Sequence, residues 1–194
     1  MNPIVKTGGS LLVIAGIAAA ALGGVNAATA PTIAQKKEAS TQKAMKAVFL
    51  PTTAKDEEID ALPITFDQPV EVPESEIINS YSKSSDGGYA FSITTKGFSA
   101  GLNLMVGIDK DGTVTGVKVV SHSETPGLGA NAETKLSPQF DNGKKAPLTV
   151  LKGSGASDSQ LEAITGATIT SNAVVNAVNE AYDYYEKNLK GGKK

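Results

Sequence analysis

A hydroxyl-rich run near the C-terminus has residue types that could bind a phosphate. It reads Thr165-Gly166-Ala167-Thr168-Ile169-Thr170-Ser171-Asn172 and precedes a stretch with helical periodicity. Small residues let another group approach the backbone, and Thr170, Ser171 or Asn172 is a good N-cap for the helix. A helix N-terminus offers free N–H groups and the positive end of the helix dipole, which would stabilise a phosphate esterified to Thr168. Taken by itself, such a run is more often an ordinary helix cap.

A second segment, Glu124-Thr125-Pro126-Gly127-Leu128-Gly129, follows an expected strand. Two glycines flanking a leucine make a loop that could lie flat against a planar ring. It is not the dinucleotide fingerprint, because no G-x-G-x-x-G opens a helix here. In isolation it is more typical of a Pro-Gly turn. Nearby His122 could relay a proton, although a surface role is the commoner one.

Composition excludes several kinds of chemistry. The 194 residues include no cysteine and one histidine, which removes thiolate metal sites, iron–sulfur clusters and multi-histidine metal sites. No metal site is therefore expected, and redox chemistry would need an organic cofactor. No residue is assigned a catalytic role. A net charge of -2 gives no sign of nucleic-acid binding.

The N-terminal thirty residues contain an uncharged apolar stretch from Leu11 to Val25, extended by small residues to Ala30. About twenty such residues can cross a bilayer, so a membrane anchor is the favoured interpretation. A cleaved secretory signal is the alternative, because Lys6 precedes the stretch and small residues follow it. A buried core helix is less favoured. Two lysines, Lys36 and Lys37, follow the stretch, and only Lys6 precedes it. The positive-inside rule therefore mildly favours a cytoplasmic location for the residues after the stretch, which is opposite to that of an exported domain.

The following segments predict an α+β domain. Residues 32–50 are expected to continue as a helix that Pro51 ends, and residues 51–73 form an acidic, proline-rich connection or edge. Alternation and β-branched residues then predict an antiparallel meander, with turns at residues 86–88 and 109–112. The expected strands are Ile77-Ile78, Tyr89–Thr95, Leu102–Ile108 and Val114–Val120.

The C-terminal third is expected to contain shorter elements and one long helix. Residues 131–136 predict a short helix, residues 148–151 a strand, and residues 153–159 a flexible loop. The final helix has an apolar face at helical spacing and is closed by Gly191-Gly192. That face consists of Val174, Val178, Tyr182, Tyr185 and Leu189.

Taken together, these motifs resemble the FMN-binding domain family of membrane electron-transfer complexes. Members have an acidic residue, a short spacer and then Ser/Thr-Gly-Ala-Thr, which here is Glu162, Ala163-Ile164 and residues 165–168. They also have the His-x-Glu-Thr-Pro-Gly-Leu-Gly segment, here residues 122–129. The resemblance covers nearly the whole chain and is strongest to the G subunit of Rnf complexes, the ion-translocating ferredoxin:NAD oxidoreductases. The related C subunit of the sodium-pumping NADH:quinone reductase shares the domain.

The resemblance implies one covalent FMN, whose phosphate a flavin transferase joins to Thr168. Glu124, Thr125 and the backbone from Gly127 to Gly129 are the expected ring contacts, and Thr165 is expected to bond near the phosphate. The expected cofactor-binding residues are Glu124, Thr125, Gly127, Leu128, Gly129, Glu162, Thr165, Gly166, Ala167 and Thr168. The family's usual acid before the motif is aspartate, so Glu162 puts the efficiency of modification in question.

The resemblance also implies partners and a location. The chain would be a single-pass membrane protein with its FMN domain on the outer face, relaying electrons between other membrane subunits of an Rnf complex that moves Na⁺ or H⁺. The expected architecture is α+β: an N-terminal transmembrane helix (1–30), a helical and irregular connection (31–73), and an FMN-binding domain (74–194) with an antiparallel sheet and a C-terminal helix. Alternatives are the flavin-bearing component of a quinone reductase, a stand-alone extracellular flavoprotein reductase, or a cofactor-free anchored binding module.

Overall fold

The computed structural model describes residues 3–191, which divide into two compact units between Gln42 and Lys43. In the first unit the chain forms most of helix α1 (Pro3–Ala47), which continues beyond residue 32 as the sequence predicted. The helix ends at Ala47, and a turn over residues 48–50 separates it from Pro51. Several of its described apolar side chains are exposed, among them Leu12 and Leu22 at 75% and 72%. Within the described residues, no helix combines the length and apolar character needed to cross a membrane. The span expected over residues 1–30, like the three-part division of the chain, stays a prediction.

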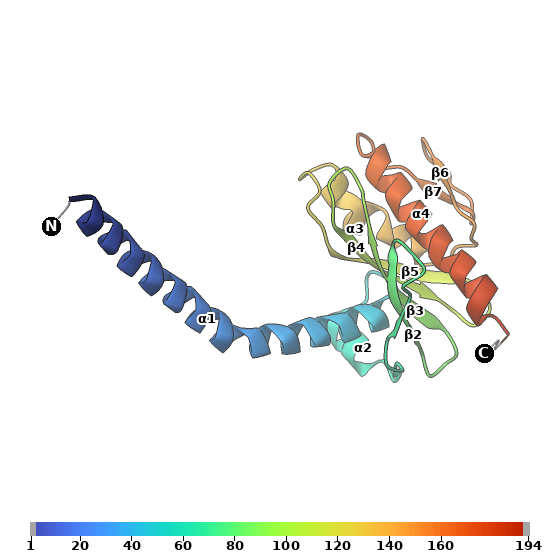
Figure 1. The fold of residues 1–194 in the computed structure, drawn as a ribbon. Helices are drawn as coiled ribbons and strands as arrows, with labels where there is room; N and C mark the ends of the chain where they lie inside the picture. The colour runs from blue at the N-terminus through green and yellow to red at the C-terminus, as the bar shows by residue number, and fades with distance from the viewer. Residues whose placement is uncertain (1–2, 192–194) are drawn as a thin grey trace. The chain divides into compact units, whose positions relative to one another are not determined.

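The second unit is built on a five-stranded antiparallel sheet (Figure 1). Its strands follow one another in chain order as a meander, which the sequence predicted. They are β1 (Val70–Glu71), β2 (Ile78–Lys83), β3 (Tyr89–Thr95), β4 (Leu102–Ile108) and β5 (Val114–Ser121). The proline-rich connection supplies the edge strand β1, where proline does least harm.

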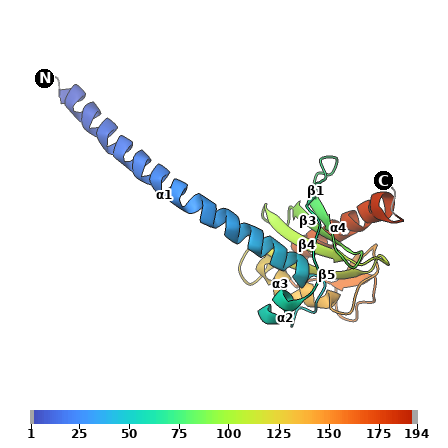
Figure 2. The same cartoon turned by 90° about the horizontal axis from the view of Figure 1, so that it is seen from below.

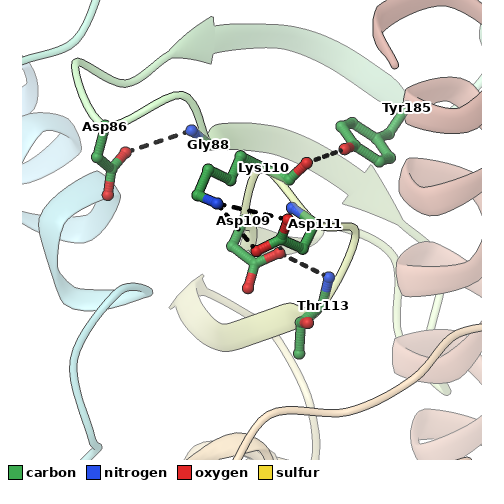
Figure 3. Close-up of polar contacts among 7 residues, drawn as sticks. All are labelled: Asp86, Gly88, Asp109, Lys110, Asp111, Thr113 and Tyr185. Carbon is green, nitrogen blue, oxygen red and sulfur yellow. Dashed lines mark hydrogen bonds and ion pairs between the residues drawn. The ribbon is translucent and has the colours of Figure 1, made fainter. Parts of the chain in front are cut away.

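The turn between β4 and β5 illustrates how local sequence forms the meander (Figure 3). Asp109 Oδ1 accepts hydrogen bonds from the backbone N–H groups of Asp111 and Thr113, at 2.9 and 2.8 Å. Gly112 has φ +89°, a conformation that side chains rarely adopt. The Tyr185 hydroxyl donates to the Lys110 carbonyl at 2.9 Å, which ties this turn to the C-terminal helical segment.

The sheet has apolar side chains on both faces. One face carries alternate residues such as Phe91, Leu104 and Val106, which pack in the main core with α4 (Thr168–Tyr184). Figures 1 and 2 both show α4 lying against the sheet. The other face carries Ala90 and Met105, which pack in a smaller core with the last turn of α1. The α+β prediction, with an antiparallel sheet and a C-terminal helix, is therefore confirmed.

The end of α1 reaches the sheet because two strand positions have no side chain. Gly107 and Gly116 are paired across β4 and β5. A Cβ atom would lie 2.7 Å from the Val48 carbonyl oxygen at Gly107 and 2.6 Å from it at Gly116. Thr115 Oγ1 instead donates a hydrogen bond to that oxygen at 2.7 Å. Close approach of the backbone is the usual reason for glycine inside a strand.

Short elements connect β5 to α4. The 3₁₀ helices η1 (Gly129–Asn131) and η2 (Ser137–Phe140) flank α3 (Ala132–Lys135), which matches the predicted short helix. Strand β6 (Thr149–Leu151), also predicted, pairs in parallel with β7 (Gln160–Glu162). After α4 the chain makes a π-helical turn, η3 (Tyr185–Leu189), and the expected apolar helix face is buried or partly buried.

Two elements differ from the sequence expectation. Helix α2 (Asp56–Ala61) lies where an irregular connection was expected. Its acidic first turn suits a helix N-terminus, and Ile59 is buried while Asp56 pairs with Lys43 at 2.9 Å. Strand β7 was also not predicted, because its three residues carry too short a pattern. Gly192, the second expected closing glycine, lies outside the described residues.

Candidate functional site

A cavity of about 370 Å³ opens where three segments distant in sequence meet. These segments are the β3–β4 connection, the loop after β5, and the start of α4. The lining residues are Phe98, Glu124, Thr125, Leu128, Gly129, Gly166, Ala167, Thr168, Ile169 and Thr170. The two sequence motifs, separated by about forty residues, thus line one pocket. The volume lies at the lower end of the range for small-molecule sites.

Helix α4 begins inside this pocket without a side-chain cap. Its N-cap residue is Ala167, and the first helical residue is Thr168. The expectation that Thr170, Ser171 or Asn172 caps the helix is therefore wrong. Ser171 lies one turn inside the helix, where its Oγ accepts from the Ile164 N–H at 3.0 Å and donates to the Ala167 carbonyl at 3.1 Å.

The uncapped helix start has a chemical consequence. The first N–H groups of an α-helix have no partner within the helix. Where no side chain accepts from them, they and the helix dipole offer a binding site for an anion such as a phosphate. The start of α4, a helix of 17 residues, provides this arrangement at the pocket wall.

The three hydroxyl side chains at the start of α4 differ in accessibility. Thr168 is half-buried and lines the pocket. Thr170 is fully buried and donates a hydrogen bond to Glu124 Oε2 at 2.7 Å. Ser171 is also fully buried, with both of its hydrogen bonds directed to the backbone just before α4. Among these three residues, only Thr168 is accessible to a molecule that enters the pocket.

Glu124 is the one charged residue among those lining the pocket, and its side chain is buried. Its Oε1 accepts from the Ser99 N–H at 2.9 Å, and its Oε2 accepts from Thr170. The carboxylate therefore bonds to two segments of the protein. His122 is exposed, and its Nδ1 accepts from the Glu124 N–H at 3.2 Å.

The remaining residues of the glycine-containing loop form one side of the pocket. Thr125, Leu128 and Gly129 line it, and Leu128 is 42% exposed. Gly127 turns the loop with φ +78° and is not a lining residue. Its carbonyl accepts from Asn131 Nδ2 at 2.9 Å. The loop thus presents an apolar side chain, which suits contact with a flat ring.

Two apolar lining residues were not among those expected from sequence. Phe98 is 67% exposed in the β3–β4 connection, and Ile169 is 57% exposed beside Thr168. The available signal was weak: an aromatic residue between Gly97 and Ser99 in a polar connection, and an isoleucine outside the buried face of the helix. With Leu128, they give the pocket lining three exposed apolar side chains, and apolar lining is typical of small-molecule sites.

Besides Gly127, two expected site residues do not line the pocket, Glu162 and Thr165. Glu162 belongs to β7, and its Oε1 accepts from the N–H groups of Gly155 and Ala156 at 2.6 and 3.3 Å. In this structure its carboxylate holds the 153–156 loop. Thr165 is exposed just before the lining residue Gly166. The observed contacts of Glu162, the acid that precedes the threonine motif, are therefore with the protein's own backbone.

The residues present fit an FMN group. The exposed apolar side chains suit a planar aromatic ring, and the uncapped start of α4 suits its phosphate. Thr168, the first residue of that helix, also lines the pocket. Gly166 brings the backbone close to Leu128, because a Cβ there would lie 3.1 Å from Leu128 Cδ2.

Comparison with known proteins agrees with this description. Residues 97–183 match the model of the FMN-binding domain, and residues 1–48 match that of the RnfG N-terminal region. The G subunit of the Na(+)-translocating ferredoxin:NAD(+) oxidoreductase complex of Acetobacterium woodii is 36% identical over 193 residues, covering 94% of this chain and 92% of that one. The G subunit of the ion-translocating oxidoreductase complex of Methanosarcina acetivorans is 35% identical, covering 90% of both chains.

Solved structures show the same fold. The C subunit of the Na(+)-translocating NADH-quinone reductase from Parabacteroides distasonis has a TM-score of 0.56 at 19% identity, covering 81% of this chain and 95% of that one. NqrC from Shewanella oneidensis has a TM-score of 0.58 at 18% identity, covering 76% and 93%. At these identities the likeness concerns the fold alone.

Fold, pocket and family match together define a protein with an FMN-binding domain. The similarity to the two relatives extends over nearly the full length of each chain. The chain belongs to the RnfG family, the G subunits of Rnf ion-translocating oxidoreductase complexes. The resemblance noted from the two motifs is thereby confirmed.

Proposed function

We propose that Thr168 carries one FMN in phosphoester linkage and that the chain relays electrons within an Rnf complex. The observation that carries the proposal is the position of the Thr168 hydroxyl. It is half-buried, lines the pocket, and opens an uncapped helix. The buried hydroxyls of Thr170 and Ser171 are already engaged, which argues against attachment at either.

The linkage requires an activated flavin donor. A flavin transferase would transfer the FMN phosphoryl group from a flavin nucleotide anhydride to Thr168 Oγ1. The bond between Thr168 Oγ1 and the FMN phosphorus forms, and the anhydride bond breaks. The second nucleotide leaves as its monophosphate, and the hydroxyl proton passes to a base of the transferase or to water. The N–H groups at the start of α4 would stabilise the charge on the phosphoryl oxygens.

When bound, FMN supplies one- or two-electron transfer. The chain's own residues would orient the group and limit its contact with water. Phe98, Leu128 and Ile169 provide the apolar walls, while the covalent bond to Thr168 prevents loss of the cofactor. Thr125 and the backbone near Gly129 are candidates for polar contacts to the ring.

Mass spectrometry tests the attachment. The full chain is expressed with a flavin transferase, and its intact mass and in-gel fluorescence are measured. One FMN adduct is expected on the unsubstituted chain and none on Thr168→Ala. Thr149→Ala is the matched control, because Thr149 is an exposed threonine outside both the motif and the pocket lining, and it should retain the adduct. An adduct that persists on Thr168→Ala would overturn the assignment. Absence of any adduct on the unsubstituted chain would favour a cofactor-free binding module.

We also propose that residues 1–30 anchor the chain in the membrane, with the flavin domain on the outer face beside other Rnf subunits. The support is the uncharged run from Leu11 to Val25 and the family membership. The full chain should remain in the membrane fraction after a high-salt wash, with its N-terminal residues present by mass. A soluble chain lacking residues 1–30 would favour the cleaved signal instead. Co-purified proteins would distinguish an Rnf complex from a quinone reductase.

A further inference from the structure

The buried carboxylate of Glu124 connects three parts of the flavin pocket. Glu124 itself belongs to the loop after β5 and is 5% exposed. Its Oε1 accepts from the Ser99 N–H in the β3–β4 connection, at 2.9 Å. Its Oε2 accepts from Thr170 Oγ1 in the first turn of α4, at 2.7 Å. Each oxygen thus binds a different wall of the same cavity.

The neighbouring backbone leaves room for this carboxylate and for little else. A Cβ at Gly97 would lie 2.4 Å from Glu124 Oε1, and a Cβ at Gly129 would lie 2.2 Å from Oε2. Both glycines are buried, and neither has a positive φ, so their backbone conformation does not itself demand glycine. The close approach of the carboxylate is therefore the reason that these positions lack side chains.

Both observed hydrogen-bond partners of the Glu124 carboxylate, the Ser99 N–H and the Thr170 hydroxyl, are uncharged. The ion pairs found among the described residues do not include Glu124. Burying a carboxyl group is costly unless it is hydrogen-bonded, so a buried carboxyl with two partners is an expensive way to join loops. The cost of burying this carboxyl group is understandable at a site where three segments of the chain must keep fixed positions relative to one another.

We propose that Glu124 is a positioning residue, which fixes the Phe98 loop relative to the start of α4. Ser99, which Glu124 binds, is adjacent to Phe98, and Thr170 lies two residues after Thr168. The carboxylate therefore sets the separation between the exposed aromatic wall and the flavin attachment point. This inference rests on the proposed function and adds a positioning role to the ring contact expected of Glu124.

Amide hydrogen exchange tests the positioning role without any flavin. The full chain is produced without a flavin transferase, and exchange of the Ser99 N–H is compared with that of amides in β4. Glu124→Ala should speed exchange at Ser99 by about tenfold or more, because its hydrogen-bond acceptor is removed, while β4 stays protected. Glu124→Gln keeps an acceptor and should stay near the unsubstituted rate. Glu133→Ala, at an exposed position, is the control.

The other partner supplies a second variant. Thr170→Val removes the donor to Glu124 and should also loosen the Ser99 segment, whereas Thr170→Ser retains the hydroxyl and should not. Equal exchange at Ser99 in Glu124→Ala and the unsubstituted chain would overturn the proposal. So would acceleration that is the same at Ser99 and throughout β4, since that would indicate general destabilisation.

The flavin-loaded chain provides a separate readout. In Glu124→Ala carrying the adduct, iodide should quench flavin fluorescence more strongly, and the midpoint potential should shift towards that of FMN in water. Glu124→Gln should restore the quenching behaviour. If the adduct forms but neither exchange nor quenching changes in Glu124→Ala, this inference alone fails. If the unsubstituted chain forms no adduct, the proposed function fails while the exchange result still decides the role of Glu124.

Discussion

At the scale of single residues, similar side chains at the start of α4 have different tasks because the fold gives them different surroundings. Thr168 is half-buried at the pocket, whereas Thr170 and Ser171 are fully buried. Thr170 bonds across the pocket to Glu124, and Ser171 bonds locally to the segment that precedes the helix. A hydroxyl near a helix start is therefore insufficient to identify an attachment site; its exposure and existing bonds also matter.

Ser171→Ala should destabilise the domain by about 1–3 kcal/mol, because the buried Ile164 N–H loses its acceptor. Urea unfolding of the unmodified chain measures the change. The turn that holds Thr168 would also loosen, so the yield of FMN adduct should fall. Asn172→Ala is the matched control, since Asn172 is exposed in the same turn. Equal stability of Ser171→Ala and the unsubstituted chain would contradict the assigned role.

At the scale of elements, α4 and the π-helical turn after it carry aromatic side chains that pack against the sheet. Tyr184 contacts Tyr81 and Phe91, with ring centroids 5.8 and 6.3 Å apart, and Tyr185 contacts Tyr89 at 5.7 Å. These contacts lie towards the end opposite the start of α4. Since the same helix forms the pocket wall at Thr168, the aromatic contacts help to fix that wall in place.

The aromatic cluster predicts a loss of stability at high pH. Burial, with a smaller contribution from the hydrogen bond to Glu74, raises the pKa of Tyr184 to about 12 from 10.0. The folded state thus favours the neutral phenol. Its contribution to stability is complete below pH 10 and is lost as the pH rises towards about 12. The melting temperature should fall over this range, and the fall should be smaller for Tyr184→Phe. An equal fall in both chains would contradict this.

The docking of the α1 end on the sheet predicts the effect of adding one methyl group. Gly116→Ala would place a Cβ 2.6 Å from the Val48 carbonyl oxygen. Because a backbone atom must move, we expect a loss of about 1–3 kcal/mol in unfolding free energy, measured in urea. Thr115→Val, which removes only the hydrogen bond to Val48, should cost about 1 kcal/mol. Gly116→Ala with unchanged stability would show that the contact is loose.

At the scale of the whole molecule, both apolar cores lie within the second compact unit. The larger core extends from Val72 to Tyr185, and the smaller core begins at Ala44. The last turn of α1 therefore belongs structurally to the sheet domain, although it is part of the N-terminal helix. The pocket lies in this same unit, so its geometry is formed by residues after Gln42.

This division predicts where the chain can be shortened. A chain of residues 43–194 should fold, because it retains Lys43, Val48 and both cores. A chain that begins at Pro51 lacks Met45 and Val48 and should melt at a clearly lower temperature, since it exposes Ala90 and Met105. Thermal unfolding followed by circular dichroism compares the two. Equal melting temperatures would indicate that the end of α1 adds little to the domain.

The sequence by itself predicted the elements whose causes are local. Alternating apolar residues and turn glycines specified β3, β4 and β5, and the spacing of Val174, Val178 and Tyr185 specified the buried face of the last helix. The two motifs also indicated the FMN-binding family. Such features depend on residues a few positions apart, where chirality and side-chain periodicity restrict the backbone strongly.

The tertiary structure decided which side chains meet and what each one does. Glu124 and Thr170 are separated by 46 residues and Glu124 and Ser99 by 25, so their hydrogen bonds have no signal in local sequence. Phe98 lines the pocket although the sequence did not single it out, and Glu162 does not line it. Ser171 lies within the helix that it was expected to cap. The sequence thus singled out Thr168, whereas only packing between distant segments made it the accessible hydroxyl, because that packing buries Thr170 and Ser171.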